Sequence, residues 1–207
     1  MAAAQTTASA SVTPDAPVSR PIRLLRVVIL LAGGLAILFT ATLHEQLGFD
    51  LGIASGLIGA IGLAHLIDWF ARRPVNPSTI PLLLGIVAIL AAIALPFMIT
   101  AIGFAVIVSA WSLVSALLEF ISTTVRPGSR QDTALLGGIG VLLAILVLLL
   151  REDPVAVIGM LGAYAIIAGV FLGISAFDFR RGTAATPADL SAGSPAEPTR
   201  PSVESER

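Results

Sequence analysis

Residues 80–121 read IPLLLGIVAILAAIALPFMITAIGFAVIVSAWSLVSALLEFI, and Glu119 is their only charged residue. A helix that crosses a bilayer needs ~20 mostly apolar residues, so this stretch holds two such helices, over 80–97 and 98–121. Similar apolar stretches occupy 27–43, 51–71, 134–150 and 154–177. The mean hydropathy is +0.95 and 12% of the residues are charged, so a water-soluble fold could not cover this surface. The sequence predicts an all-α protein, a six-helix transmembrane bundle built from three hairpins.

The 207 residues leave room for one membrane domain and short tails. We expect a disordered cytoplasmic tail over 1–21, a six-span membrane domain over 22–181 and a second disordered cytoplasmic tail over 182–207, because the tails are rich in Ala, Ser, Thr and Pro. The net charge of −1 argues against a nucleic-acid partner, and the absence of cysteine excludes disulfides and thiolate metal sites. The first apolar stretch is too long for a signal peptide, so we interpret it as an uncleaved span.

The arginines predict the orientation in the membrane. Lys and Arg concentrate in short cytoplasmic loops. With both termini in the cytoplasm, nine arginines fall on the cytoplasmic side and only Arg151 on the other. The nine are Arg20, Arg23, Arg26, Arg72, Arg73, Arg126, Arg130, Arg180 and Arg181. We therefore predict a multi-pass protein of the bacterial inner membrane with cytoplasmic termini.

The second helix of each predicted hairpin ends in a similar way. An acid and an aromatic residue are followed by arginine near 68–73, 119–126 and 177–181, a recurrence of roughly 53 residues. This spacing favours an internal hairpin repeat. An alternative explanation is that every cytoplasmic helix end carries aromatic and arginine anchors.

Small residues recur at helical spacing on three of the predicted helices, and flat faces of this kind let membrane helices approach closely. We expect these faces to pack against other helices within the bundle, and the alternative is a homodimer face. The residues are Gly48, Gly52, Gly56, Ala60 and Ala64 on the second helix, Ala101, Ala105 and Ser109 on the fourth, and Ala165, Gly169 and Gly173 on the sixth.

Ionisable residues inside a membrane are costly and therefore candidates for function. His65 and Asp68 lie on one face of the second predicted helix, and Glu119 lies at the matching depth of the fourth. A structural ion pair with the nearby arginines is favoured, because all three lie within about two turns of the cytoplasmic end. A proton-sensitive site is the main alternative. A metal site made of one imidazole and two carboxylates is disfavoured, and we predict no metal.

Other polar groups suggest no enzyme. His44 lies in an outer connection and is expected to be a solvated loop residue, although histidine titrates near neutral pH. With His44 and His65 as the only histidines, no set of nucleophile, base and acid can be assembled. We expect no catalysis and no cofactor. The predicted surroundings are the lipid bilayer, with a homo-oligomer as an option, and the sequence identifies no protein partner.

Several segments carry a resemblance to a known family. They are WSLVSALLEF at 111–120, LGGI at 136–139, Asp153-Pro154, and GAYAIIAG at 162–169. With six spans in three hairpins, the chain resembles the HdeD-like acid-resistance membrane proteins of bacteria. The resemblance implies a role in protection against acid or envelope stress and no defined catalytic or ligand residue. The alternative function is a small transporter or channel for protons or a small solute.

Overall fold

The computed structural model describes residues 20–44, 46–72, 78–125 and 130–182. Six α-helices and two short 3-10 helices form among these residues, without a β-strand. They are α1 (Arg20–Phe39), η1 (Ala41–Leu43), α2 (Leu47–Arg72), α3 (Ile80–Ala94), η2 (Leu95–Phe97), α4 (Ala101–Val125), α5 (Arg130–Leu149) and α6 (Pro154–Gly182). The predicted all-α architecture is confirmed. The predicted tails lie outside the described residues except for the first turn of α1 and the last residue of α6.

Five helices are long and apolar enough to cross a membrane: Pro21–Phe39, Leu47–Arg72, Ile80–Phe97, Ala101–Thr123 and Pro154–Ala176. The remaining helix, α5, differs because its described apolar part, Ala134–Leu149, is shorter. The whole of α5 has 20 residues, which gives a length of about 30 Å, close to the hydrocarbon thickness.

The helix starts follow from local chemistry. Pro81 lies in the first turn of α3 and Pro154 begins α6, where the missing N–H costs nothing. The hydroxyl of Thr100 accepts a hydrogen bond from Gly103 N at the start of α4. Asp153 Oδ1 accepts one from Ala156 N at 3.0 Å and so caps α6. These caps separate the long apolar stretches into individual helices.

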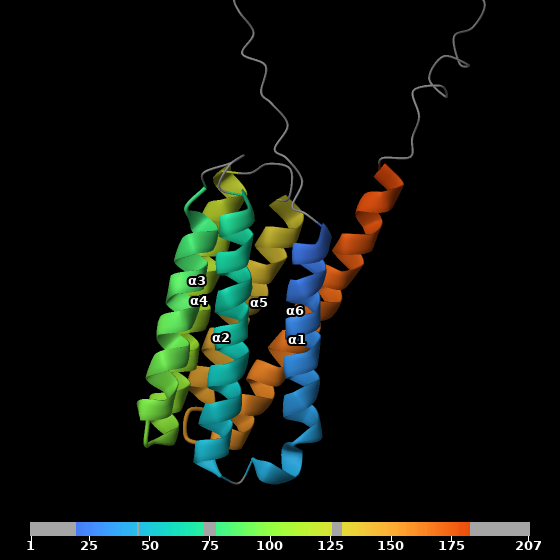
Figure 1. Ribbon diagram of the computed structural model, residues 1–207. Coiled ribbons are helices and arrows are strands. Elements are labelled where there is room, and N and C mark those ends of the chain that lie inside the picture. Colours follow the sequence, from blue (N-terminus) through green and yellow to red (C-terminus); the bar gives the residue numbers. More distant parts are fainter. Residues whose placement is uncertain (1–19, 45, 73–77, 126–129, 183–207) are drawn as a thin grey trace, which may run out of the picture. The chain divides into compact units, whose positions relative to one another are not determined.

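Successive helices run in opposite directions, so the arginine-bearing ends gather at one end of the bundle (Figure 1). The start of α1, the end of α2 and the start of α5 carry Arg23, Arg72 and Arg130. Arg151, in the connection before α6, lies at the other end. Arg73 and Arg126 lie outside the described residues. We call the two ends the arginine-rich end and the arginine-poor end.

The closest helix contacts join neighbouring hairpins. α2 packs most extensively on α3, and α4 on α5. α6 packs on α1, where a Cβ on Gly162 would lie 2.9 Å from Ile37 and one on Gly169 would lie 2.9 Å from Leu31. The chain forms two compact units that meet within α6, after Ala176, and all of this packing lies in the first unit.

Two of these contacts are built alike. Ser55 of α2 donates a hydrogen bond to the carbonyl of Ala92 in α3 at 2.7 Å, and Ser109 of α4 donates one to Ala144 in α5 at 2.7 Å. Ser55 and Ser109 are 54 positions apart in the sequence. These equivalent bonds favour an internal repeat. The alternative, that each helix end merely carries aromatic and arginine anchors, does not account for matching bonds away from those ends.

The packing face predicted for α2 is wrong over its first half. Gly48, Gly52 and Gly56 are exposed, and a Cβ on any of them would meet nothing within 4 Å. The contact with α3 instead uses Gly62, where a Cβ would lie 3.0 Å from Ala88 and 3.1 Å from the carbonyl oxygen of Gly85. Ala64 is buried and Ala60 partly buried, so the stripe turns inward only near its end. A four-residue spacing drifts around a helix of 3.6 residues per turn, and it does not identify the buried face.

Large apolar side chains fill the middle of the bundle. Ile58, Phe104, Val108 and Leu161 are fully buried, and they come from α2, α4 and α6. Their positions along the helices place them between the polar groups of the arginine-rich end and those of the arginine-poor end. This apolar layer separates two polar regions.

Candidate functional site

A small cavity lies on the arginine-rich side of the apolar layer. Its volume is about 30 Å³, enough for one or two water molecules. Its polar lining comes from α1, α2, α4 and α6 and includes Arg26, His65, Trp111, Ser115, Glu119 and Tyr164. From Glu119 to Trp111 the lining follows α4 for about two turns, roughly 12 Å at 1.5 Å per residue. The cavity therefore reaches from near the arginine-rich end toward the middle of the bundle.

Arg26 joins two of the residues predicted as a polar cluster. Its Nη2 lies 3.5 Å from His65 Nε2 and 4.0 Å from Glu119 Oε1. His65 is buried, whereas the side chains of Arg26 and Glu119 are 24% and 16% exposed. His65 and Glu119 are 54 positions apart, the same spacing as Ser55 and Ser109. The repeat thus presents one polar side chain from α2 and one from α4 to a single arginine of α1.

Asp68 does not join this cluster. Its carboxylate accepts two hydrogen bonds from Arg72, at 2.7 Å from Nε and 2.8 Å from Nη2. The pair lies one turn apart on α2 and has the bidentate geometry that arginine and carboxylate favour. For Asp68 the structure shows an ion pair with Arg72, the interpretation that the sequence favoured. Among the described residues, no three His, Asp or Glu side chains gather closely enough to hold a metal ion.

The inner end of the cavity is formed by two aromatic residues. Trp111 of α4 is 4% exposed, and its ring meets that of Tyr164 of α6 edge-on, with centroids 6.1 Å apart. The Nε1–H of Trp111 is buried and has no hydrogen-bond acceptor among the described residues. A buried donor without a partner costs free energy. It is therefore a point where a bound group would be stabilised.

Sequence reasoning missed Arg26, Trp111 and Tyr164 as parts of one site. Arg26 was counted as a topological arginine, yet it lies a full turn and a half inside α1 and lines the cavity. The two aromatic residues lie far apart in sequence, within apolar stretches. A signal was present, because a tryptophan and a tyrosine in mid-helix differ from the interfacial placement that these residues prefer in membranes.

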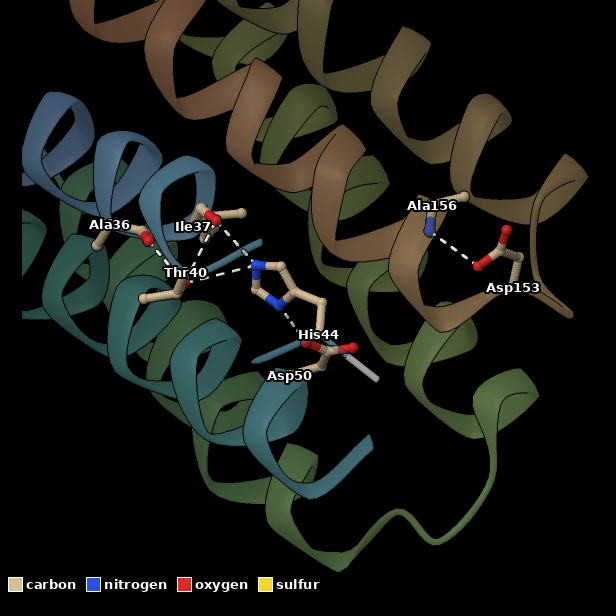
Figure 2. A network of polar contacts seen from close by, with 7 residues as sticks. All are labelled: Ala36, Ile37, Thr40, His44, Asp50, Asp153 and Ala156. Carbon is tan, nitrogen blue, oxygen red and sulfur yellow. Dashed lines mark hydrogen bonds and ion pairs between the residues drawn. The ribbon is translucent and has the colours of Figure 1, made fainter. Parts of the chain in front are cut away.

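A second polar group lies at the arginine-poor end (Figure 2). His44 is only 4% exposed and Asp50 is fully buried, so the expectation that His44 is a solvated loop residue is wrong. His44 Nδ1 lies 2.5 Å from Asp50 Oδ1, and Nε2 lies 2.8 Å from the carbonyl oxygen of Ile37. The connection through η1 folds back, and this brings the loop histidine between the end of α1 and the first turn of α2.

The partners of His44 specify its protons. Both ring nitrogens face oxygen atoms, and a carbonyl oxygen can only accept. Nε2 therefore carries a proton that it donates to Ile37. A second proton must lie between Nδ1 and the Asp50 carboxyl group, on whichever atom holds it. The pair loses its central hydrogen bond if that proton leaves.

No protein-family model, curated protein or solved structure matches the chain. The resemblance to HdeD-like proteins therefore rests on the sequence segments alone.

Proposed function

We propose that this chain is a multi-pass protein of the bacterial inner membrane, with both termini cytoplasmic, that protects the cell during acid or envelope stress without catalysing a reaction. The long apolar helices support the membrane location, and the grouping of arginines supports the orientation. The observation that carries the proposed function is the buried pair of His44 and Asp50 at the arginine-poor end.

This pair is placed to respond to external protons. In the proposed orientation the arginine-poor end faces the periplasm, whose pH follows that of the medium. A proton held between His44 and Asp50 keeps α1 and α2 connected at this end, so acid conditions preserve the connection.

A survival assay tests the proposal. A deletion strain should lose viability across pH 3–5, roughly the range in which carboxyl groups titrate, and wild-type protein should restore it. Asp50→Asn should restore it less well at equal membrane abundance, because an amide cannot share a proton with the imidazole in the same way. Asp68→Asn is the matched control at the other end and should restore survival. Equal survival of the deletion and parent strains would refute the proposed role.

The orientation has a separate test. Reporter fusions ending at Gly48 and Asp153 should report the periplasmic side, and fusions ending at Asn76 and Ser129 the cytoplasmic side. A cytoplasmic signal at Gly48 would invert the topology. The His44–Asp50 pair would then face the cytoplasm, and its proposed exposure to external pH would be lost.

A second candidate function is transport of a proton or small solute. The cavity favours it, because binding sites of transporters lie near the middle of the membrane between helices. The apolar layer closes the cavity toward the arginine-poor end, as alternating access requires of one state. Flux into proteoliposomes that Glu119→Gln abolishes and Asp68→Asn preserves would establish transport through the cavity. Absence of flux for protons and small anions would exclude it.

A further inference from the structure

Two hydrogen-bond donors at the cavity are poorly satisfied. Arg26 has its contacts with His65 and Glu119 at 3.5 and 4.0 Å, beyond the 2.7–3.2 Å of good N–H···O bonds. By contrast, Arg72 makes bonds of 2.7 and 2.8 Å to its carboxylate. The Nε1–H of Trp111 has no acceptor among the described residues. Arg26 and Trp111 both line the cavity, so two residues around the same space carry donors without close acceptors.

Such an arrangement favours a bound group that accepts hydrogen bonds and carries negative charge. A guanidinium group inside a membrane bundle is costly unless a counterion and acceptors satisfy it. Glu119 is the one carboxylate in the cavity lining. Its Oε1 lies 4.0 Å from Arg26 Nη2.

We propose that the cavity is a binding site for a small monovalent anion, such as a halide or formate. Arg26 supplies the positive charge near the mouth, and the Trp111 N–H donates a hydrogen bond at the inner end. The cavity volume of about 30 Å³ suits a ligand of one to three heavy atoms and excludes phosphate esters and nucleotides. The anion site goes beyond the proposed stress function, and the two proposals are tested independently.

The surrounding charges make Glu119 a competitor of the anion for Arg26. The titratable groups around the Glu119 carboxylate are Arg26 from α1, His65 from α2 and Tyr164 from α6. The lining from α3 and α5 is uncharged and consists of Leu84, Ala88, Leu136 and Gly140. Neutralising Glu119 therefore leaves Arg26 as the dominant charge and should strengthen anion binding.

The two tryptophans provide a direct measurement. With ¹⁵N-labelled tryptophan, the protein gives one indole N–H resonance from Trp69 and one from Trp111, assigned with Trp69→Phe. Titration of the full-length protein in nanodiscs with formate, and separately with chloride, should shift the Trp111 resonance downfield in a saturable way. Gluconate, which is too large, should leave it unchanged at equal ionic strength.

Three variants identify the residues responsible. Arg26→Gln should lower the affinity at least tenfold, and Glu119→Gln should raise it severalfold. Arg151→Gln is the control, because Arg151 lies at the arginine-poor end, beyond the apolar layer and outside the cavity lining, and it should bind like wild type. If Arg26→Gln does not fold, saturation and selectivity in the wild-type protein decide the matter.

Two results would overturn the proposal. One is a Trp111 resonance that no anion shifts, which would mean that the cavity holds water only. The other is an equal, non-saturable shift in the wild-type protein and Arg26→Gln, which would indicate a general salt effect. If either result is obtained while the deletion strain still loses survival in acid, the proposed stress function stands and only the anion site is rejected.

Discussion

The two ends of the bundle hold their buried polar groups in different ways. At the arginine-poor end, His44 and Asp50 are 4% and 0% exposed, and their polar contacts are 2.5 and 2.8 Å long. At the arginine-rich end, Arg26 contacts His65 and Glu119 at 3.5 and 4.0 Å beside a cavity. The first group has short contacts and leaves one carboxylate oxygen, Asp50 Oδ2, buried without a partner, whereas the second leaves the Trp111 N–H without one beside a cavity. Contact length and free space, more than residue type, distinguish a structural polar pair from a candidate binding site.

The largest effect is expected at the closed end. Asp50→Ala removes the partner of His44 Nδ1 and should lower the free energy of unfolding by about 3 kcal/mol, as expected when one partner of a buried polar pair is removed. Thermal unfolding in detergent measures this, with Asp68→Ala as the control. A loss for Asp68→Ala as large as that for Asp50→Ala would erase the difference between a closed pair and a partly exposed one.

At the other end, helix packing should matter more than the polar cluster. Gly62→Val places atoms against Ala88 and the Gly85 carbonyl, and it should cost about 1–3 kcal/mol, as overpacked core sites do. Gly56→Val is the matched control, since a Cβ there meets nothing within 4 Å. Melting temperatures of the two variants test the assignment. Destabilisation of Gly56→Val alone would mean that α2 is buried on the opposite face.

Between the ends, single interhelical hydrogen bonds should contribute modestly. Ser109→Ala removes the bond to Ala144, and the expected loss is about 0.6 kcal/mol, the average for such bonds in membrane helices. Ser55→Ala, at the equivalent position of the repeat, should behave alike. If the stability losses of the two variants differ by more than about 1.5 kcal/mol, the two contacts are not equivalent.

The smallest effect on stability is expected at the cavity. Arg26→Gln removes only the long contacts to His65 and Glu119, and partly exposed ion pairs contribute about 0–1 kcal/mol. The melting temperature should change little, although anion binding should be lost. Destabilisation by Arg26→Gln as large as that by Asp50→Ala would show that both ends are structural, and the comparison would fail.

Much of the architecture could be predicted from hydropathy. The apolar stretches and the residues that interrupt them place the helices, because a bilayer requires ~20 apolar residues per crossing and caps such as Asp153 begin new helices. The arginine pattern predicts that the start of α1, the end of α2 and the start of α5 share one end, and the alternating helices bring these helix ends together (Figure 1). These features depend on local composition alone.

The buried faces and the sites could not be predicted in the same way. The spacing of Gly48, Gly52 and Gly56 is as regular as that of a packing face, yet they are exposed, because complementarity with α3 selects Gly62. In an apolar chain every helix face is hydrophobic, so periodicity carries little information about orientation. The neighbours of a face are decided by the fit between helices.

The sequence by itself determined the helical class and the approximate helix boundaries, since both depend on the transfer of short segments between water and lipid. Only the tertiary structure decided that Asp68 bonds to Arg72, that Arg26 turns toward His65 and Glu119, and that His44 is buried against Asp50. The Arg26 and His44 contacts join different helices, and the choice of partner for Asp68 depends on which face of α2 is turned inward. Helix packing sets these distances, and they are not encoded in any one segment.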